Sequence, residues 1–468
     1  MLKKIKMEVK GWAISGQKPP DQLTDDGVSV GIPYMTWLPE VDSYRLNISS
    51  LHFGKKKRGR FSPELEVFDP KVHGTIEEFL KKFKITRRNC TSVVARIPDI
   101  LGRIAPLSLR LKSDIRKLIQ ENPAWDDPIT ERQRLRWTTN FKMIEDVRDI
   151  YYSRCVVPSN ATSLRADFWI LCDAAEIGVM VGCYASFPLP DNKRSCSNVL
   201  GKGLLAPDEW TIPRKELSAF DTAACVKTVL ERALEGWIEN IYVGGDSEIA
   251  LAWCSYENVK LQTFHRNKVI NIRSRISLNQ LHHVIGSENP TDIGTRPDSV
   301  TAESVMPGST WLEGKDWLKK PYKNAVEDGI VKTIADLKLS NEAKQALKEG
   351  VAFDEFDKDE SAFAVSQINT IDVNKVAKRE AFSDYLYPVL KRSFLSTVRI
   401  MSTVMKAVKK FEIFGVRCKV KRKEVDVSKL NEMENELEKV KFTVFTAENR
   451  SDRLFESING YLVKGAFS

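Results

Sequence analysis

The sequence predicts an α/β fold in which a mixed sheet of five strands is flanked by helices. Between residues 165 and 300, apolar runs that suit buried strands alternate with runs whose apolar residues recur at helical spacing. Three strands come first and are joined by short turns, whereas helices separate the strands that follow. Hairpin-connected strands followed by crossover strands give a sheet with both antiparallel and parallel pairs.

The bulk composition sets wide limits. The 468 residues, 42% hydrophobic and 29% charged, suit a soluble protein of several domains. We see no apolar run long enough to cross a bilayer and no signal peptide in Met1–Gln17. Eight cysteines without a C-x-x-C motif suit a reducing, intracellular location, cytoplasmic or nuclear. A net charge of +9 fits a polyanionic partner and fits an ordinary basic protein about as well.

Residues 1–160 predict a small strand region followed by helices. Tyr34–Ile48 alternates weakly, which favours a strand pair around Pro39. The basic cluster Lys55–Arg60 (KKKRGR) fits phosphate contact or a nuclear signal, and fits a solvated loop better. Helical periodicity then marks Leu107–Gln120 and Ile129–Ile150.

The elements of the sheet region follow in order. We expect strands at Asp167–Asp173, Val179–Phe187, Ser195–Leu205, Ile241–Asp246 and Leu281–Gly286. We expect helices from about Arg214 to Leu234 and at Ser247–Ser255, Thr263–Ile272 and Asn289–Thr295. After about residue 300 the chain loses strand character, and Trp311 and Trp317 are expected to anchor it to the preceding domain. Charged helical patterns follow from about residue 351.

Four acids lie at the ends of these elements. Asp173 and Asp246 end strands, Glu216 lies in the first turn of the long helix, and Asp292 opens the last one. Each alone fits a structural role, such as a helix cap for Asp292 or a first-turn acid for Glu216. Together they are expected to converge on one sheet edge, where ionised carboxylates need a positive partner. Two Mg²⁺ or Mn²⁺ ions about 4 Å apart, held by these four residues, are suited to phosphodiester hydrolysis.

Several motifs resemble the BEL/Pao long-terminal-repeat retrotransposon polyprotein. The runs IPRKEL, GDSEIALAW, FHRNKVINIRS and ENPTDIGTRP are similar to the family's IPRLEL, TDSxxALxW, FVxNRVxEI and NPADxxSRG. Glu216, Asp246 and Asp292 fall on the family's acids, and Asp173 falls on the acid of its SDAS run. IPDILGRIAP, at Ile97–Pro106, is similar to FDPLGLLSP. The resemblance implies a ribonuclease H-like domain that hydrolyses the RNA strand of RNA–DNA hybrids.

The resemblance also implies a domain plan. It assigns a remnant of the reverse transcriptase C-terminal part to 1–100, a helical connection to 101–160, the RNase H-like domain to 161–300, a Trp-anchored extension to 301–350 and a charged helical linker or tail to 351–468. The family's polymerase motif YxDD is not found. LTDDG at Leu23–Gly27 lies too close to Trp37 and Asp42, which resemble the family's LGxxW…D segment, because the family's YxDD lies far upstream of that segment. We therefore expect no polymerase or integrase active site, and polyprotein neighbours that this chain lacks.

Two other functions stay open. One is a catalytically silent retroelement fragment that binds nucleic acid or a protein. The other is the aspartic peptidase implied by the family label "Pao retrotransposon peptidase", which needs Asp residues in D-T/S-G loops. The nearest string, at Asp221–Ala223, falls within a helical pattern, which argues against the peptidase. A histidine often assists RNases H near the last acid, and His282 and His283 are the candidates, although both fall in an expected strand.

An RNA–DNA hybrid, or another nucleic acid, is expected to be recognised without sequence specificity, through phosphates and 2′-hydroxyls. The candidate contacts, each of which fits a solvated helix surface equally well, are Arg214, Lys215, Arg266, Lys268, Arg273 and Arg275.

Overall fold

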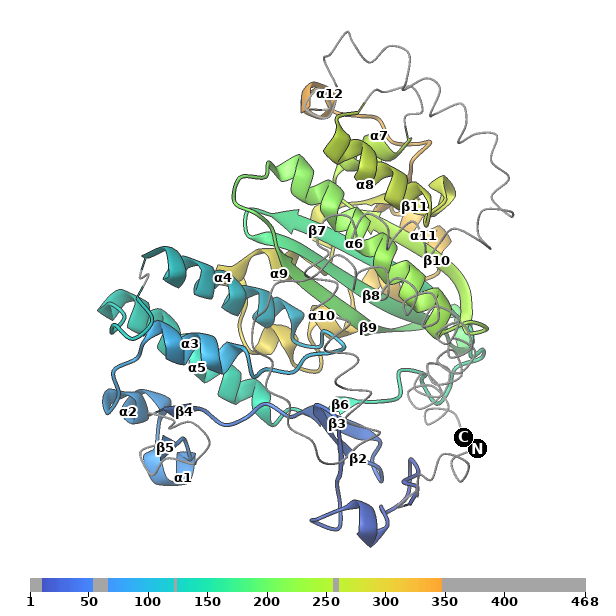
Figure 1. Ribbon diagram of the computed structural model, residues 1–468. Helices are drawn as coiled ribbons and strands as arrows, with labels where there is room; N and C mark the ends of the chain where they lie inside the picture. The colour runs from blue at the N-terminus through green and yellow to red at the C-terminus, as the bar shows by residue number, and fades with distance from the viewer. Residues whose placement is uncertain (1–10, 54–65, 122–123, 256–260, 347–468) are drawn as a thin grey trace, which may run out of the picture. The chain divides into compact units, whose positions relative to one another are not determined.

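A computed structural model describes residues 11–53, 66–121, 124–255 and 261–346 (Figure 1). All of them belong to one of the two compact units of the chain. The predictions for Lys55–Arg60 and for the tail from residue 351 lie outside the described residues. In the described part, no helix is both long and apolar enough to cross a membrane.

The main sheet has six strands in the order β12-β11-β10-β7-β8-β9. β7, β8 and β9 form an antiparallel meander, β10 and β11 add in parallel, and β12 closes the other edge antiparallel to β11. Five strands match the prediction, but the expectation that strand character ends near residue 300 was wrong, because β12 follows. The strands are β7 (Ala166–Ala175), β8 (Gly178–Pro188), β9 (Arg194–Leu205), β10 (Ile238–Gly245), β11 (Leu281–Val284) and β12 (Val331–Thr333).

Helices pack on both faces of this sheet (Figure 1). Alternate side chains of β7, including Phe168 and Ile170, pack with α6, α7 and α8 in one core. The residues between them, Trp169 and Leu171, pack with Trp317 on the opposite face. The helices of the first face are α6 (Ile212–Ala233), α7 (Glu248–Ser255) and α8 (Thr263–Arg273).

The N-terminal region contains a second, smaller sheet in the order β1-β2-β3-β6. It confirms the predicted strand pair, and a two-stranded β4–β5 ribbon and five helices follow. The expected remnant and the expected connection share one hydrophobic core, in which Phe53 packs against Phe79 and Phe141. The elements are β1 (Val30–Ile32), β2 (Met35–Leu38), β3 (Ser43–Leu46), β4 (His52–Phe53), β5 (Glu66–Val67), α1 (Pro70–His73), α2 (Ile76–Lys81), α3 (Arg87–Val94), α4 (Ala105–Glu121), α5 (Glu131–Arg148) and β6 (Tyr152–Ser153).

The IPDILGRIAP run joins this region to edge strand β9. Gly201 of β9 donates its backbone N–H to the carbonyl of Leu101 at 2.8 Å. Gly102 has a φ of +70°, and a Cβ at this position would lie 1.9 Å from the carbonyl oxygen of Gly201. The Asp99 carboxylate accepts the backbone N–H groups of Arg103 and Ile104 at 2.7 and 3.0 Å, which holds the start of α4. The run therefore covers part of an exposed strand edge with backbone.

Two buried tryptophans anchor the segment after residue 300, as predicted. The indole N–H of Trp311 donates to the carbonyl of Arg103 at 3.0 Å, and that of Trp317 donates to the carbonyl of Glu288 at 2.9 Å. The helices of this segment are α10 (Thr310–Glu313), α11 (Tyr322–Glu327) and α12 (Asn341–Ala346).

Candidate carboxylate site

Strand register places Asp173 and Asp246 side by side. β10 runs parallel to β7, with Gly244 opposite Leu171. Continued by two residues on each strand, this register sets Asp246 beside Asp173. Neighbouring strands lie about 4.8 Å apart, and laterally paired residues point to the same face. The side chain of Asp173 is buried, with 8% of the residue exposed, so a charge there is costly without a partner.

Glu216 reaches this pair from α6. The expectation that it lies in the first turn was wrong, because the helix begins at Ile212, with Pro213 next, rather than at Arg214, and Glu216 falls just beyond the first turn. The hydroxyl of Ser247 donates to Oε2 of Glu216 at 2.5 Å. The same hydroxyl accepts the backbone N–H of Ala250 at 3.1 Å and so caps α7. Since Ser247 directly follows Asp246, this hydrogen bond connects the carboxylate of Glu216 to the end of β10.

The fourth acid, Asp292, opens α9 (Asp292–Thr295), which lies across the end of β7. The side-chain amide of Asn289 donates to the carbonyl of Cys172 at 2.9 Å and fastens this segment to the strand. The hydroxyl of Thr295 donates to the carboxylate of Asp173. Asp292 itself forms an ion pair with Arg296 at 2.8 Å, and its side chain is 29% exposed.

The acids influence one another electrostatically. Burial and the negative charge of Asp246 raise the pKa of Asp173 to about 7. Burial also raises the pKa of Asp246, and the charge of Asp292 adds to this increase. The pKa of Glu216 is raised by burial and by Asp246, against the hydrogen bond from Ser247, which lowers it. Ionised together, these groups repel unless a cation lies among them.

The donor set consists of carboxylate oxygens, which are the ligands that Mg²⁺ and Mn²⁺ prefer. Asp173, Glu216 and Asp246 carry no ion pair with a Lys or Arg among the described residues, and only Asp292 does. Over the described ranges, however, no three His, Cys, Asp or Glu side chains stand close enough together to hold one metal ion. The chemistry of the donors fits a divalent cation, while the acids as placed are not closed around one.

The two candidate histidines differ. His282 is buried in an aromatic group, with its ring nitrogens 2.9 Å from the carbonyl of Gln280 and 3.0 Å from the hydroxyl of Tyr322. His283 pairs with Gly245, the residue before Asp246, in the β10–β11 register. Its charge lowers the pKa of Asp246, and burial lowers the pKa of His283 itself. Only His283 is therefore near the acids.

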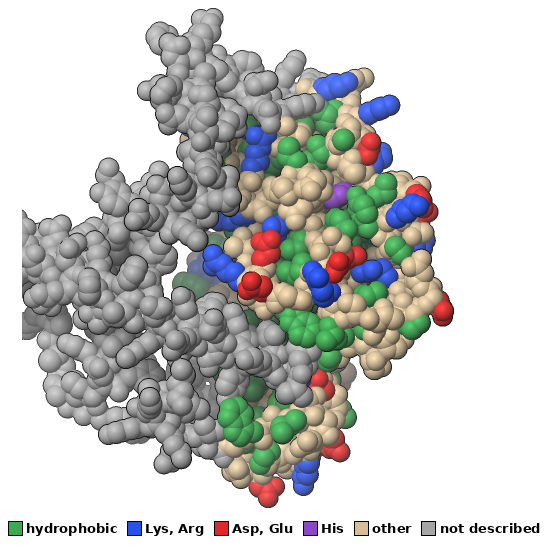
Figure 2. Space-filling view, turned by 90° about the vertical axis from the view of Figure 1, so that its right-hand side faces the viewer, with side chains coloured by type: hydrophobic (Ala, Val, Ile, Leu, Met, Phe, Trp, Pro, Cys, Tyr) green, Lys and Arg blue, Asp and Glu red, His purple; other side chains and the backbone are tan. Residues whose placement is uncertain are grey.

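The candidate nucleic-acid contacts lie on α6, on α8 and, for Arg275, just after α8. Lys215 is buried and donates to the carbonyl of Glu176 at 2.7 Å, which does not fit a role in contacting nucleic acid. Arg266 is exposed. The other four interact inside the domain: Arg214 lies over the ring of Phe264, Lys268 pairs with Asp221, Arg273 donates to the carbonyl of Cys254 and Arg275 donates to Asn271. Basic and acidic side chains are also interspersed on the face shown in Figure 2.

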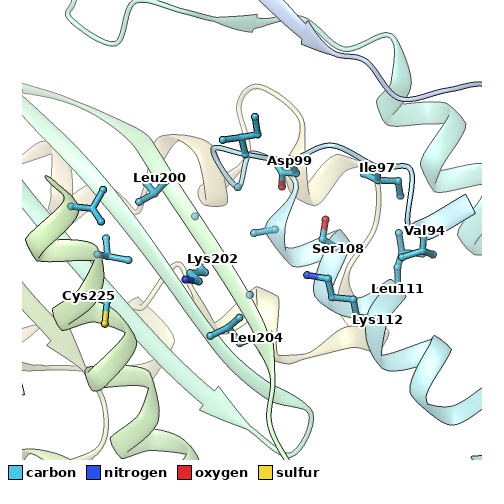
Figure 3. Close-up of a pocket in the computed structure, with 17 residues that line it drawn as sticks. Val94, Ile97, Asp99, Ser108, Leu111, Lys112, Leu200, Lys202, Leu204 and Cys225 are labelled. Carbon is cyan, nitrogen blue, oxygen red and sulfur yellow. The ribbon is translucent and has the colours of Figure 1, made fainter. Parts of the chain in front are cut away.

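A cavity of about 430 Å³ lies elsewhere, between α4, β9 and α6 (Figure 3). Its lining is mostly apolar, and Lys112 and Lys202 extend into it from α4 and β9. None of the four acids lines this cavity. Sequence reasoning did not find it, because its walls come from elements that are far apart along the chain.

Residues 86–247 match the family described as the Pao retrotransposon-like RNaseH-like domain. This part of the chain is therefore similar to Pao-type RNase H-like domains. The match contains the IPDILGRIAP run and three of the acids, and Asp292 follows it. The description names an RNase H-like domain rather than a peptidase, and Asp221 lies inside α6, where the peptidase loop cannot form.

Among solved structures, the chain is similar to one titled as the foamy viral protease-reverse transcriptase dRH in complex with ds DNA. The two are 9% identical, the similarity covers 55% of this chain and 37% of that chain, and the TM-score is 0.29. At this score the likeness carries no argument about shared geometry. No curated protein matches the sequence.

Proposed function

We propose that the Pao-type domain hydrolyses the RNA strand of RNA–DNA hybrids with the help of divalent metal ions. The observation that carries this proposal is the strand register that brings Asp246 beside Asp173. Hydrogen bonds from Ser247 and Thr295 fasten the segments of the other two acids to that pair. Retention of all four acids in a domain of the RNase H-like type supports a nuclease.

Asp173, Glu216, Asp246 and Asp292 are the residues that would hold the cations. Two Mg²⁺ or Mn²⁺ ions supply an activated water and stabilise the leaving oxygen of a phosphodiester. The carboxylates take part in their ionised form, so Asp173 has to lose the proton that its raised pKa retains near neutrality. Asp292 has to leave its ion pair with Arg296, whose side chain is 65% exposed and free to move into solvent.

Recognition of the hybrid is proposed to be independent of sequence. An A-like duplex offers phosphates and 2′-hydroxyls, which cationic side chains and backbone N–H groups bind whatever the bases are. Of the predicted contacts, the exposed Arg266 is the best placed to reach a phosphate, and the buried Lys215 is the worst placed.

The decisive experiment uses the full chain with a hybrid labelled separately on its RNA and DNA strands. Cleavage of the RNA strand that requires Mg²⁺ and stops in Asp246→Asn is expected. Glu209→Gln, which removes an exposed acid next to α6, serves as the control and should cleave normally. Cleavage that persists in Asp246→Asn would assign the activity to another site.

A catalytically silent binding module is the second candidate. The ion pair of Asp292 with Arg296 favours it, because this pair turns the fourth acid toward a cation of the protein itself. Titration of the same hybrid by fluorescence anisotropy separates the two functions. Binding without cleavage in either Mg²⁺ or Mn²⁺ would support the silent module and overturn the nuclease.

A further inference from the structure

Two neutral hydroxyl groups donate to two of the four acids from the segments that carry the other two, Thr295 to Asp173 and Ser247 to Glu216. We propose that Thr295 and Ser247 are positioning residues that orient the carboxylates for divalent cations. The inference rests on the proposed function, since it concerns the same acids. It adds two residues to which neither the family match nor the sequence pattern gives a role.

Thr295 links the first and the fourth acid. It lies on α9, one turn after Asp292, and its hydroxyl reaches the carboxylate of Asp173 on β7. The hydroxyl has one proton and a second acceptor within range, the backbone carbonyl of Asp292 at 3.0 Å. Because a hydrogen bond to an ionised acceptor is the stronger one, the proton goes to Asp173 when that acid is ionised. The fourth acid is then held over the end of β7.

Ser247 links Glu216 to Asp246, the residue that it directly follows in the chain. Its hydroxyl donates to Glu216 on α6, while its backbone directly follows Asp246 on β10. The lone pairs of that hydroxyl accept the N–H of Ala250, so the proton is oriented away from α7 and toward Glu216. The orientation of Glu216 is therefore fixed by the start of the helix that follows β10.

Neutral donors suit this task better than cationic ones. A lysine or arginine would neutralise the acids and compete with the metal ion for them. A hydroxyl occupies one of the roughly four lone-pair positions of a carboxylate and leaves the charge and the other positions for a cation. In metal sites generally, hydrogen-bond partners of this kind orient the side chains that bind the metal. Their loss should therefore weaken metal binding more than it weakens the fold.

The inference is tested without reference to activity by measuring the affinity of the full chain for Mn²⁺. Binding is monitored as the loss of the free-ion signal in electron paramagnetic resonance. Thr295→Val removes the hydroxyl at nearly constant volume and should weaken Mn²⁺ binding by roughly 10- to 100-fold. Thr295→Ser keeps the hydroxyl and should restore most of the affinity. The matched control is Thr228→Val on α6, where the lost hydroxyl bonds only the carbonyl of Ala224.

The second hydroxyl is tested with a pair of substitutions at Ser247. Ser247→Gly removes the donor to Glu216 while glycine preserves much of the helix cap. Ser247→Thr retains both the hydroxyl donor to Glu216 and the helix cap. The glycine variant should lose Mn²⁺ affinity over the same roughly 10- to 100-fold range, and the threonine variant should not. Unfolding midpoints in EDTA and far-ultraviolet circular dichroism identify any variant that fails to fold, and the conservative substitutions then decide the question.

The outcomes separate this inference from the proposed function. If Thr295→Val and Ser247→Gly bind Mn²⁺ as wild type does, the positioning role is refuted and the nuclease stands. If both lose affinity but the wild-type chain never cuts a hybrid, the positioning role stands and the nuclease is refuted. A wild-type chain that binds no Mn²⁺ overturns both.

Discussion

Replacement of Asp173 by asparagine should stabilise the metal-free protein while it abolishes cleavage. Asp173 is buried beside Asp246, and the cost of ionising it there is the physical reason for its raised pKa. Asparagine keeps an oxygen that accepts the hydroxyl of Thr295, and its amide is able to donate to the neighbouring carboxylate. The substitution therefore removes the charge without removing the hydrogen bond.

The size of the effect follows from the pKa. Each unit of difference between the folded and the unfolded state is worth about 1.36 kcal/mol. Between the ordinary value of 3.8 and about 7, the folded protein binds more protons than the unfolded chain does. The free energy of unfolding therefore falls as pH rises through this window. The full cost at pH 8 is about 4 kcal/mol and the cost at pH 5 is about 2 kcal/mol, so asparagine should gain roughly 2 kcal/mol more at pH 8.

Urea titrations in EDTA, monitored by tryptophan fluorescence, measure the difference in unfolding free energy between Asp173→Asn and the wild type at pH 5 and at pH 8. Buried Trp169 and Trp253 report on the two faces of the sheet around the site. Glu209→Gln changes an exposed acid and should leave the stability nearly unchanged at either pH. If Asp173→Asn raises the unfolding free energy equally at pH 5 and pH 8, or does not raise it, the reasoning that ionised Asp173 destabilises the metal-free protein is refuted.

Three further predictions follow from the same structure. Gly102→Ala should destabilise the protein by several kcal/mol more than Gly236→Ala, measured by urea titration, because both have positive φ but only the first meets backbone within 2 Å. Cleavage and Mn²⁺ affinity should both rise with pH through about 7, because Asp173 loses its proton to solvent and its ionised carboxylate can then bind the metal; initial rates and Mn²⁺ titrations in matched buffers will show this. Arg266→Ala should weaken hybrid binding and lower the slope of log affinity against log salt by about one, whereas Lys215→Met should not change that slope in fluorescence anisotropy.

The sequence was sufficient for the centre of the fold because the local signals there agree. Long apolar runs predicted β7 and β8, and helical periodicity after a proline predicted α6. β12 was missed because three residues, with Lys332 turned outward between Val331 and Thr333, are too few to show a period. Such a short strand is selected by the neighbouring edge of β11, which no local pattern reveals.

The candidate site was predictable as a set of acids but not as a structure. Each acid stood at the end of an element, and the topology of a mixed sheet was enough to suggest convergence. The burial of Lys215 was not visible, because its helix position alone does not show that it meets the carbonyl of Glu176. The roles of Thr295 and Ser247 were hidden for the same reason, since a hydroxyl in a helical turn normally serves its own backbone.

The position of Asp292 makes the helical region before the sheet part of the site. The guanidinium of Arg110, on α4, donates to the carbonyls of Pro297 and Val300, each at 2.8 Å, just beyond α9. Trp311 adds a second tie from the following segment to the start of α4. The fourth acid is therefore held between α4 on one side and the end of β7 on the other. Because α4 supports the segment that carries Asp292, the helical region within the family match, which begins at residue 86, helps to hold the fourth acid.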